Sequence, residues 1–327
     1  MDINDIARRA GVSRATISRY LNDGYVSKEK RELIARIIDE TGYVPSQHAQ
    51  QLRTGKTQLV GVIIPKINSQ SVGRMVAGIT DELNKNGYQV ILANTNNNED
   101  LEVDFLNLFG TQNRVDGIIL IATVLTPAHH RLMRRLRVPC VVLGQRVSIN
   151  PCVYQDDYHA VFELTSFALR KAKVPGYLGV FEQDVAAGKM RHQGFVDACE
   201  RAGVFSPPEA QLVVDFDADS GYFGAEKLLD TVKGIDTIVC ATDDIAFGAM
   251  MCAFEYGYLV PDDIQVTGVG DSLLSRIARP SLSTAHLHYR SSGNMAARLL
   301  IDSIKGKHNE VSEHRMGFEV YTRNSMR

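Results

Sequence analysis

The chain has 327 residues, of which 44% are hydrophobic and 23% are charged, and its formal net charge is -2. This composition is ordinary for a folded protein of two or three domains, and it excludes a disordered or strongly polyionic chain. No apolar run approaches the roughly 20 residues that a membrane helix needs, so we expect no membrane partner.

Neither secretion nor metal binding is indicated by the sequence. The N-terminus lacks a basic segment followed by an apolar one, which is the pattern of a secretory signal. Five widely spaced cysteines lie in apolar runs and form no Cys-x-x-Cys pair. We therefore expect reduced thiols in a cytoplasmic protein, with no metal site and no cofactor.

The first predicted elements are two short helices joined by a corner, within Ile3–Leu21. Ala7 is small enough for the helices to approach, Gly11 provides the corner, and Ile17 fills the space between them. Ser13 is a suitable N-cap for the second helix. This spacing is typical of a helix-turn-helix, whose second helix lies in the DNA major groove. A plain helical hairpin with solvated arginines remains the alternative at this point.

Two further segments complete the N-terminal part. Ser27 precedes a predicted helix over residues 28–41, whose apolar stripe closes a three-helix head. Residues 43–56 then hold about two helical turns between Pro45 and Gly55, too few to be stable alone. Residues 1–57 carry a net charge of +3 and the remainder -5, as suits a head that meets phosphates.

From Leu59 onward, apolar runs alternate with helical patterns, which predicts two doubly wound α/β units with parallel sheets. Such units place a ligand cleft at the carboxyl ends of their strands. The expected strands occupy residues 59–65, 89–93, 117–122, 140–144, 153–157, 177–180, 211–214, 237–240, 265–269 and 318–321. The expected helices occupy residues 71–86, 100–112, 126–136, 157–171, 187–202, 220–232, 244–256 and 289–304.

Motifs along nearly the whole chain resemble those of the lactose/galactose-repressor family of bacterial transcription factors. In the head they are AspIleAlaArgArgAlaGlyValSerArgAlaThrIleSerArg (5–19) and TyrValProSerGlnHisAlaGlnGlnLeuArg (43–53). In the α/β units they are ArgHisGlnGlyPhe (191–195), CysAlaThrAspAsp (240–244) and ValThrGlyValGlyAspSer (266–272). Within the family, the segment 179–191 is most similar to trehalose repressors, with sucrose-operon repressors close behind.

The resemblance implies an α/β fold with a helix-turn-helix headpiece and two parallel-sheet lobes of periplasmic-binding-protein type. The headpiece would occupy residues 1–45, a hinge helix and linker 46–58, and an effector-binding and dimerisation core 59–327. Within the core, the first lobe would hold about 59–158 with a late crossover near 285–290. The second lobe would hold about 159–284 and 291–327.

The family's DNA-contacting positions fall on polar or small residues of the head. Arg14, Ala15 and Arg19 correspond to base-reading positions, and arginine suits the guanine edge. Ser13, Thr16 and Asn22 would contact phosphates. Ala49 and Leu52 lie in the segment that the family folds into a minor-groove hinge helix, with Leu52 wedged between base steps.

Effector contacts are implied at the strand ends. Arg191 matches a family arginine that binds effector hydroxyls or charge. Asp243 lies just past a strand end, where a sheet presents ligand contacts, although Asp243 or Asp244 is equally suited to cap the next helix. Lys66, Ser69 and Ser71 combine a cation, hydroxyls and a helix N-terminus, which suit a phosphate, although a solvated lysine is the simpler alternative. Gln145, Asp157 and Asp271 complete the expected set; Arg146, Tyr154 and Phe181 are lesser candidates.

The predicted function is that of a sugar-responsive repressor. A homodimer would hold a pseudo-palindromic double-stranded operator and release it when a disaccharide, or its 6-phosphate, of trehalose or sucrose type binds. A different effector, or an activating or corepressor sign, remains open, as does a solute-binding protein, which would need a signal peptide and no head. An enzyme is not expected, because no nucleophile elbow, HisGluxxHis or phosphate loop occurs.

Overall fold

The computed structural model describes residues 1–43, 56–111, 114–307 and 311–327. It divides into two compact units, Met1–Gln58 and Leu59–Arg327. The described residues of the first unit form three helices: α1 (Ile3–Arg9), α2 (Arg14–Tyr20) and α3 (Lys28–Thr41). The predicted helix-turn-helix and the third helix are confirmed.

Local sequence explains both ends of α1 and the beginning of α2. The Asp2 carboxylate accepts the backbone N–H groups of Asn4 and Asp5, and Ser13 accepts that of Thr16. Gly11 adopts a left-handed φ of 59° at the corner, where a Cβ would be strained. Ser27 occupies the N-cap position of α3, but its side chain makes no capping hydrogen bond.

The head has a small core of its own. Ile6, Ile17 and Ile34 come from the three helices and are completely buried against one another. A single buried side chain of this size contributes about 1.5–3 kcal/mol, so burial of these three helps to hold the helices together. The core therefore sets the position and orientation of α2 within the head.

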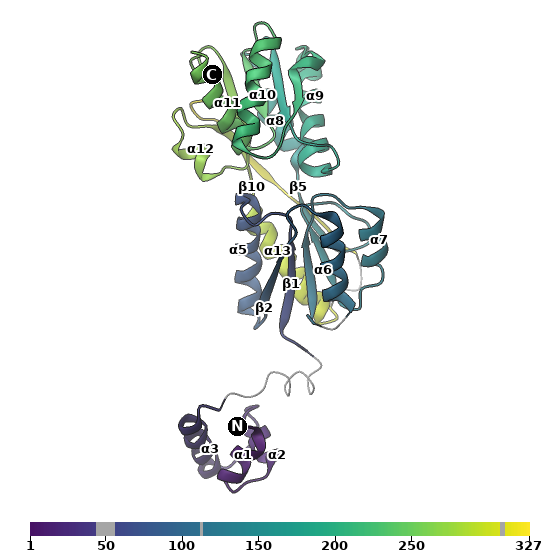
Figure 1. Ribbon diagram of the computed structural model, residues 1–327, viewed down its shortest axis with the longest axis vertical. Helices are drawn as coiled ribbons and strands as arrows, with labels where there is room; N and C mark the ends of the chain where they lie inside the picture. The colour runs from purple at the N-terminus through teal and green to yellow at the C-terminus, as the bar shows by residue number, and fades with distance from the viewer. Residues whose placement is uncertain (44–55, 112–113, 308–310) are drawn as a thin grey trace. The chain divides into compact units, whose positions relative to one another are not determined.

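In the part of the second unit that the structure describes, the strands form two six-stranded sheets, each with helices on both faces (Figure 1). The strand order is β11-β5-β4-β3-β1-β2 in the first lobe and β12-β10-β9-β8-β6-β7 in the second, with neighbours parallel except β10 and β12. The first sheet comprises β1 (Leu59–Ile64), β2 (Gln89–Asn94), β3 (Gly117–Ile121), β4 (Cys140–Leu143), β5 (Cys152–Gln155) and β11 (Glu313–Met316). The second comprises β6 (Pro175–Gly179), β7 (Gln211–Val213), β8 (Thr237–Cys240), β9 (Gln265–Val269), β10 (Ser283–Leu287) and β12 (Phe318–Tyr321).

The helices cover the sheets in pairs. In the first lobe, α5 and α13 pack together, as do α6 and α7; in the second lobe, α8 pairs with α9 and α10 with α11. The first-lobe helices are α5 (Gln70–Lys85), α6 (Glu99–Thr111), α7 (Pro127–Met133) and α13 (Tyr289–Ile304). Those of the second lobe are α8 (Asp157–Ala168), α9 (Arg191–Ala202), α10 (Ala218–Thr231), α11 (Asp243–Glu255) and α12 (Leu273–Ile277), with a π-helical turn at Val185–Met190 and a 3-10 turn at Pro208–Ala210.

Tertiary pairing corrects the expected lobe boundaries. Residues 291–327 were expected in the second lobe, but α13 packs against α5, β3, β4 and β5, and β11 pairs with β5. Both elements therefore belong to the first lobe. The sequence did not predict strands β10 and β11 or helix α12. The two strands lack an apolar pattern, because β10 is rich in serine and threonine and β11 is a polar edge strand.

The chain passes between the lobes three times within the described elements. Each passage leaves a single residue between one element and the next: Asp156 between β5 and α8, His288 between β10 and α13, and Gly317 between β11 and β12. Three such short connections side by side allow the lobes to change their angle while keeping each lobe intact.

No helix in the described part of the chain is both long and apolar enough to cross a lipid bilayer.

Candidate functional site

Helix α2 presents a polar surface away from the head core. Arg14, Ala15 and Arg19 are exposed, whereas Ile17 on the opposite side is buried. Two arginines five residues apart on an exposed short helix match the pattern of side chains that reach base edges. The structure therefore leaves the three predicted base-reading residues available.

The three residues expected at phosphates already make local hydrogen bonds. Ser13 Oγ lies 3.0 Å from Thr16 Oγ1, and the Asn22 amide donates to the Ser18 carbonyl. These bonds hold both ends of α2 in place, and hydroxyl and amide groups retain capacity for a second partner. The other two expected DNA contacts, Ala49 and Leu52, lie outside the described residues.

A cavity of about 370 Å³ lies between the two lobes, at the carboxyl ends of their strands. This volume falls in the usual range for small-molecule pockets. Seven of the eight predicted effector residues line it: Lys66, Ser69, Ser71, Gln145, Asp157, Arg191 and Asp243. Arg146, Tyr154 and Phe181 do not line it, and Arg146 instead pairs with Glu313 at 2.7 Å.

Arg191 is the buried cation at the floor of this cavity. Its Nη2 lies 2.7 Å from Asp157 Oδ1, and its Nη1 donates to the Ala241 carbonyl at 2.5 Å. Nη2 is also 3.4 Å from the hydroxyl of Tyr289. Burial raises the pKa of Asp157, while the neighbouring guanidinium opposes that shift. The pair joins α9 to α8 beside the passage at Asp156.

Another polar pair, Gln145 and Asp184, joins the two lobes. Gln145, at the end of β4, donates its amide to Asp184 Oδ1 at 2.8 Å. The same oxygen accepts the Ala187 N–H at 3.0 Å and so caps the π-helical turn that leads into α9. Burial raises the pKa of Asp184. Asp184 also lines the cavity, and a carboxylate oxygen is able to accept a hydrogen bond from a hydroxyl group.

Asp243 holds the second-lobe wall together. Its carboxylate accepts the Ser272 N–H at 2.6 Å and the Thr284 hydroxyl at 2.5 Å. Thr242, not Asp243 or Asp244, caps helix α11 with its side chain. The capping alternative for the two aspartates is therefore wrong. Asp243 lines the cavity but already satisfies neighbouring groups.

Lys66 faces acidic residues across the cavity. Hydrogen bonding to the Ser220 N–H is the largest cause of the lowered pKa of Asp217, and Lys66 adds to it. Ser69 caps α5 through the Val72 N–H and lies 3.0 Å from the Ser71 hydroxyl. The first-lobe wall is thus rich in hydrogen-bond donors.

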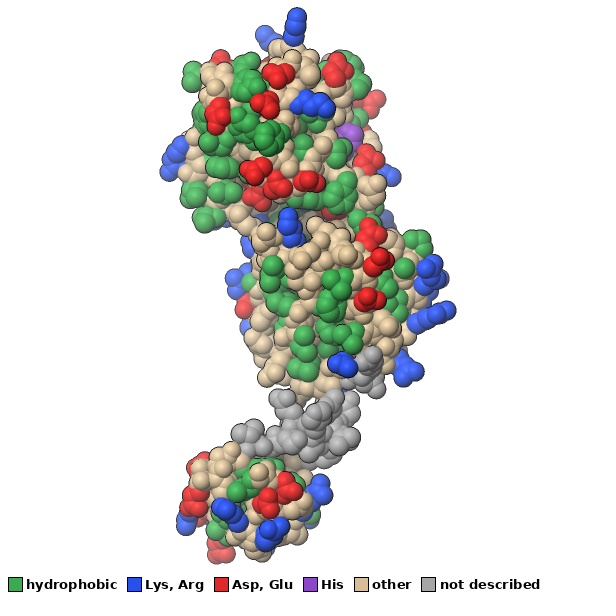
Figure 2. Space-filling model, in the orientation of Figure 1, with side chains coloured by type: hydrophobic (Ala, Val, Ile, Leu, Met, Phe, Trp, Pro, Cys, Tyr) green, Lys and Arg blue, Asp and Glu red, His purple; other side chains and the backbone are tan. Residues whose placement is uncertain are grey.

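The second-lobe wall is rich in acceptors. Asp184, Asp217 and Asp244 all line the cavity from this lobe, and Figure 2 shows acidic side chains gathered along the edge that borders the first lobe. Burial raises the pKa of Asp244, with Asp243 as a further cause. A ligand with many hydroxyl donors matches such a wall.

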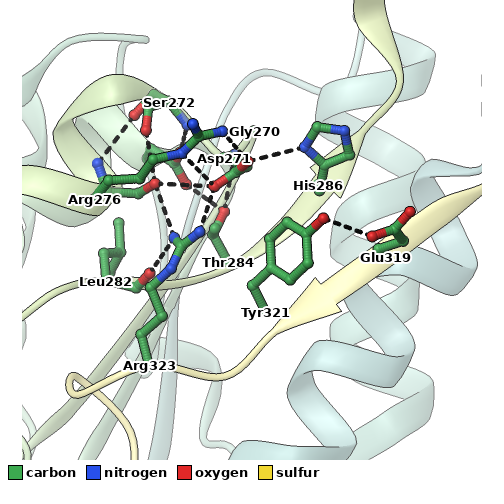
Figure 3. A network of polar contacts seen from close by, with 12 residues as sticks. Gly270, Asp271, Ser272, Arg276, Leu282, Thr284, His286, Glu319, Tyr321 and Arg323 are labelled. Carbon is green, nitrogen blue, oxygen red and sulfur yellow. Dashed lines mark hydrogen bonds and ion pairs between the residues drawn. The ribbon is translucent and has the colours of Figure 1, made fainter.

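The prediction that Asp271 contacts the effector is not supported by the structure, because its side chain does not line this cavity. Figure 3 shows its carboxylate between Arg276, Arg323 and His286. The hydrogen bonds from these three side chains measure 2.5, 2.5 and 3.0 Å, respectively. Gly270 and Asp271 have positive φ values of 137° and 48°, so the turn directs the carboxylate away from the cleft. Burial alone would raise the pKa of Asp271, but hydrogen bonds from Arg276, Arg323 and His286, together with the charge of Arg323, hold it well below its usual range.

Sequence reasoning missed several residues that line the cavity, among them the polar side chains of Arg74, Asp184, Asp217 and Tyr289. Asp184 and Asp217 do carry a local signal, since each is an N-cap before a helical pattern at a strand end. Arg74 lies in the second turn of the amphipathic α5, and nothing in its spacing separates it from a solvated surface arginine.

Comparison with known proteins decides the family. The model of bacterial regulatory proteins of the lacI family matches residues 2–46, and the model of the periplasmic binding protein-like domain matches residues 164–326. The sucrose operon repressor of Staphylococcus xylosus is 31% identical over 320 residues, covering 98% of each chain. The chain belongs to the lacI family.

This lacI-family regulator is also similar to the ribose operon repressor of Halalkalibacterium halodurans, at 32% identity over 93% of the chain and 91% of that protein. Among solved structures, the complex of the transcriptional regulator CelR with cellobiose matches with a TM-score of 0.77 and 25% identity over 99% of both chains. The predicted family and two-lobed fold with a helix-turn-helix are therefore confirmed. These relatives are transcriptional regulators.

Proposed function

We propose that this lacI-family regulator is a sugar-responsive repressor of a carbohydrate-utilisation operon, acting in the cytoplasm where its DNA lies. The observation that carries the proposal is the joining of an exposed α2 surface to a separate two-lobed core with a polar cavity between the lobes. The first part suits a DNA groove and the second suits a small polyol.

A homodimer would place two α2 helices on a pseudo-palindromic operator. Exposed apolar side chains on α10, α11 and α12 support a self-associating face, and Figure 2 shows hydrophobic side chains gathered in this part of the second lobe. They are Phe223, Met251, Phe254, Leu273 and Ile277. The residues of the expected hinge helix, 46–53, lie outside the described parts of the chain.

Effector binding would act on DNA through the angle between the lobes. A ligand changes this equilibrium only by binding one lobe arrangement more tightly than the other, and a preference of about 100-fold supplies about 2.7 kcal/mol. The relatives named for sucrose, ribose and cellobiose support a carbohydrate effector. The acceptors on the second-lobe wall support its hydroxyl groups.

The test begins by selecting operators from a library of palindromic duplexes, and then measures affinity with and without sugars. The probes are trehalose and sucrose, each free and as its 6-phosphate. Weaker DNA binding with one of them is the expected result, and tighter binding would show a corepressor instead. No preference for a palindrome over random duplex at 150 mM salt would contradict the proposal.

A phosphorylated effector would use the donors at the N-terminus of α5. Lys66→Ala should then weaken binding of the 6-phosphate much more than that of the free sugar, because it removes a cation. Lys85→Ala, at the other end of α5, is the matched control. Equal losses for both sugars would remove the phosphate role from Lys66.

A solute-binding protein is the rival proposal, since the two lobes alone would permit it. The headpiece favours the repressor, because its exposed α2 has no use in solute capture. Binding of sugar without any effect on operator affinity would favour the rival.

A further inference from the structure

The turn at Gly270 and Asp271 offers its two carbonyl groups to the other lobe. Three successive backbone N–H groups of this turn bind their own lobe: that of Gly270 donates to Ala285 O, that of Asp271 to Thr284 Oγ1, and that of Ser272 to Asp243 Oδ2. The distances are 2.8, 3.2 and 2.6 Å. The turn is therefore held rigidly by the second lobe.

The side chain of Asp271 fixes the same turn from behind. Its carboxylate is bound by Arg276, Arg323 and His286, so the strained backbone cannot relax without breaking ion pairs (Figure 3). The two carbonyl oxygens are consequently presented in one orientation.

Arg74 of α5, in the first lobe, binds both carbonyls. Its Nη2 donates to Gly270 O, and its Nη1 donates to Asp271 O at 3.3 Å. A planar guanidinium suits two neighbouring acceptors, which lysine's single ammonium serves less well. This contact joins residues from different lobes, at positions nearly 200 apart in the sequence.

Arg74 also belongs to the cavity wall. Its guanidinium lies 4.9 Å from the centre of the Tyr289 ring, and the Tyr289 hydroxyl contacts Arg191 at the cavity floor. Its Nε is buried and has no hydrogen-bond partner among the described residues. One side chain thus holds the opposite lobe with two donors and keeps a third donor beside the ligand space.

We propose that Arg74 is a positioning residue that latches the two lobes in the arrangement seen here and couples it to the ligand through its Nε. The coupling to a ligand rests on the proposed function, whereas the latch itself does not. An oxygen of the ligand at Nε would change the guanidinium's hold on Gly270 and Asp271, and hence the angle at the passages Asp156, His288 and Gly317.

The latch is tested by a distance measurement that needs neither sugar nor operator. Spin labels are attached at the exposed positions Glu99→Cys in the first lobe and Asp219→Cys in the second, and the distance between the labels reports lobe separation. The labels go to these two positions because the five native cysteines are buried. Labelled chain is diluted with unlabelled chain so that a partner copy stays silent. Arg74→Ala should broaden the distance distribution and shift its mean, and Arg74→Lys should do so less.

Arg290→Ala is the matched control, because it removes an exposed ion pair with Asp81 inside the first lobe only. It should leave the distance unchanged. A distribution for Arg74→Ala that equals that of the parent would overturn the latch. Circular dichroism on each variant separates this result from misfolding, and a folded Arg74→Lys with an intermediate distribution keeps the test valid if Arg74→Ala does not fold.

The coupling is tested with whichever of the four sugar probes alters operator affinity. Arg74→Ala should reduce the ratio of operator affinities without and with that sugar by 5-fold or more, while Arg290→Ala keeps it. An unchanged ratio would overturn the coupling. If none of the probes acts on the parent chain, the proposed effector class fails, and the distance measurement still decides the latch.

Discussion

Nη2 of Arg191 lies 2.7 Å from Oδ1 of Asp157, and both side chains are more than nine-tenths buried. The two residues come from the starts of α9 and α8, and together they form the floor of the cleft. An arginine cannot discharge itself by losing its proton, whereas a buried carboxyl can become neutral by gaining one.

This asymmetry predicts unequal costs for breaking the pair. Asp157→Asn leaves a buried, uncompensated guanidinium and should lower the free energy of unfolding by about 3–5 kcal/mol. Arg191→Met should cost less at pH 7, because the pKa of Asp157 is already raised by burial and its carboxyl can take up a proton. Urea unfolding of the two variants provides the measurement. Equal costs would contradict the argument.

Asp271 predicts a stability difference that depends on pH. Its folded pKa lies well below the unfolded value of about 3.9, so its ionised form stabilises the fold above that pH. The contribution is lost as pH falls through the folded pKa. Asp271→Asn should therefore be less stable than the parent by about 2 kcal/mol between pH 5 and 7, since it loses charged hydrogen bonds. The gap should narrow below pH 4 in thermal melts.

The exposed Asp230→Asn serves as the control for that series, because it changes the same charge on the solvent side of α10. A gap for Asp271→Asn that stays constant down to pH 2 would show that its carboxylate is not held by the surrounding cations.

Replacing either of two glycines of α5 by alanine should change the free energy of unfolding in opposite directions. A Cβ on Gly78 would lie 2.0 Å from the Arg290 carbonyl oxygen, so Gly78→Ala must push α13 away from α5. We expect a loss of about 2–4 kcal/mol, as for other overpacked contacts. Gly73→Ala meets nothing within 4 Å and should stabilise the same helix by about 0.5–1 kcal/mol. Thermal or urea unfolding separates them, and the same sign for both would be contrary evidence.

Separate substitutions of Arg14 and Arg36 distinguish a contact with a base from the general effect of positive charge on DNA affinity. Arg14→Ala should cost about 1–3 kcal/mol of operator binding and relax specificity at one base pair of each half-site. Arg36→Ala, on the exposed side of α3, removes the same charge and should change affinity little. Fluorescence anisotropy on the selected operator and on its single-base variants measures both. Uniform losses over all sequences would reassign Arg14 to a phosphate.

The headpiece could be derived from the sequence because its determinants are local. Gly11, Ser13 and Ile17 act within a few residues of the elements they define, and the structure gives α2 the predicted beginning at Arg14. The alternating apolar runs likewise located ten of the strands, since a buried parallel strand is apolar on both faces. Strand-end position was enough to bring seven expected residues to one cavity.

Other features depended on contacts between distant parts of the chain. Only strand pairing and helix packing placed α13 and β11 in the first lobe, because an amphipathic helix carries no mark of which sheet it covers. Only the backbone angles at Gly270 and Asp271 turned the Asp271 carboxylate from the cleft toward Arg323. The sequence by itself determined the elements and the family; the tertiary structure decided side-chain direction and the contact of Arg74, since these are set by long-range packing rather than by neighbouring residues.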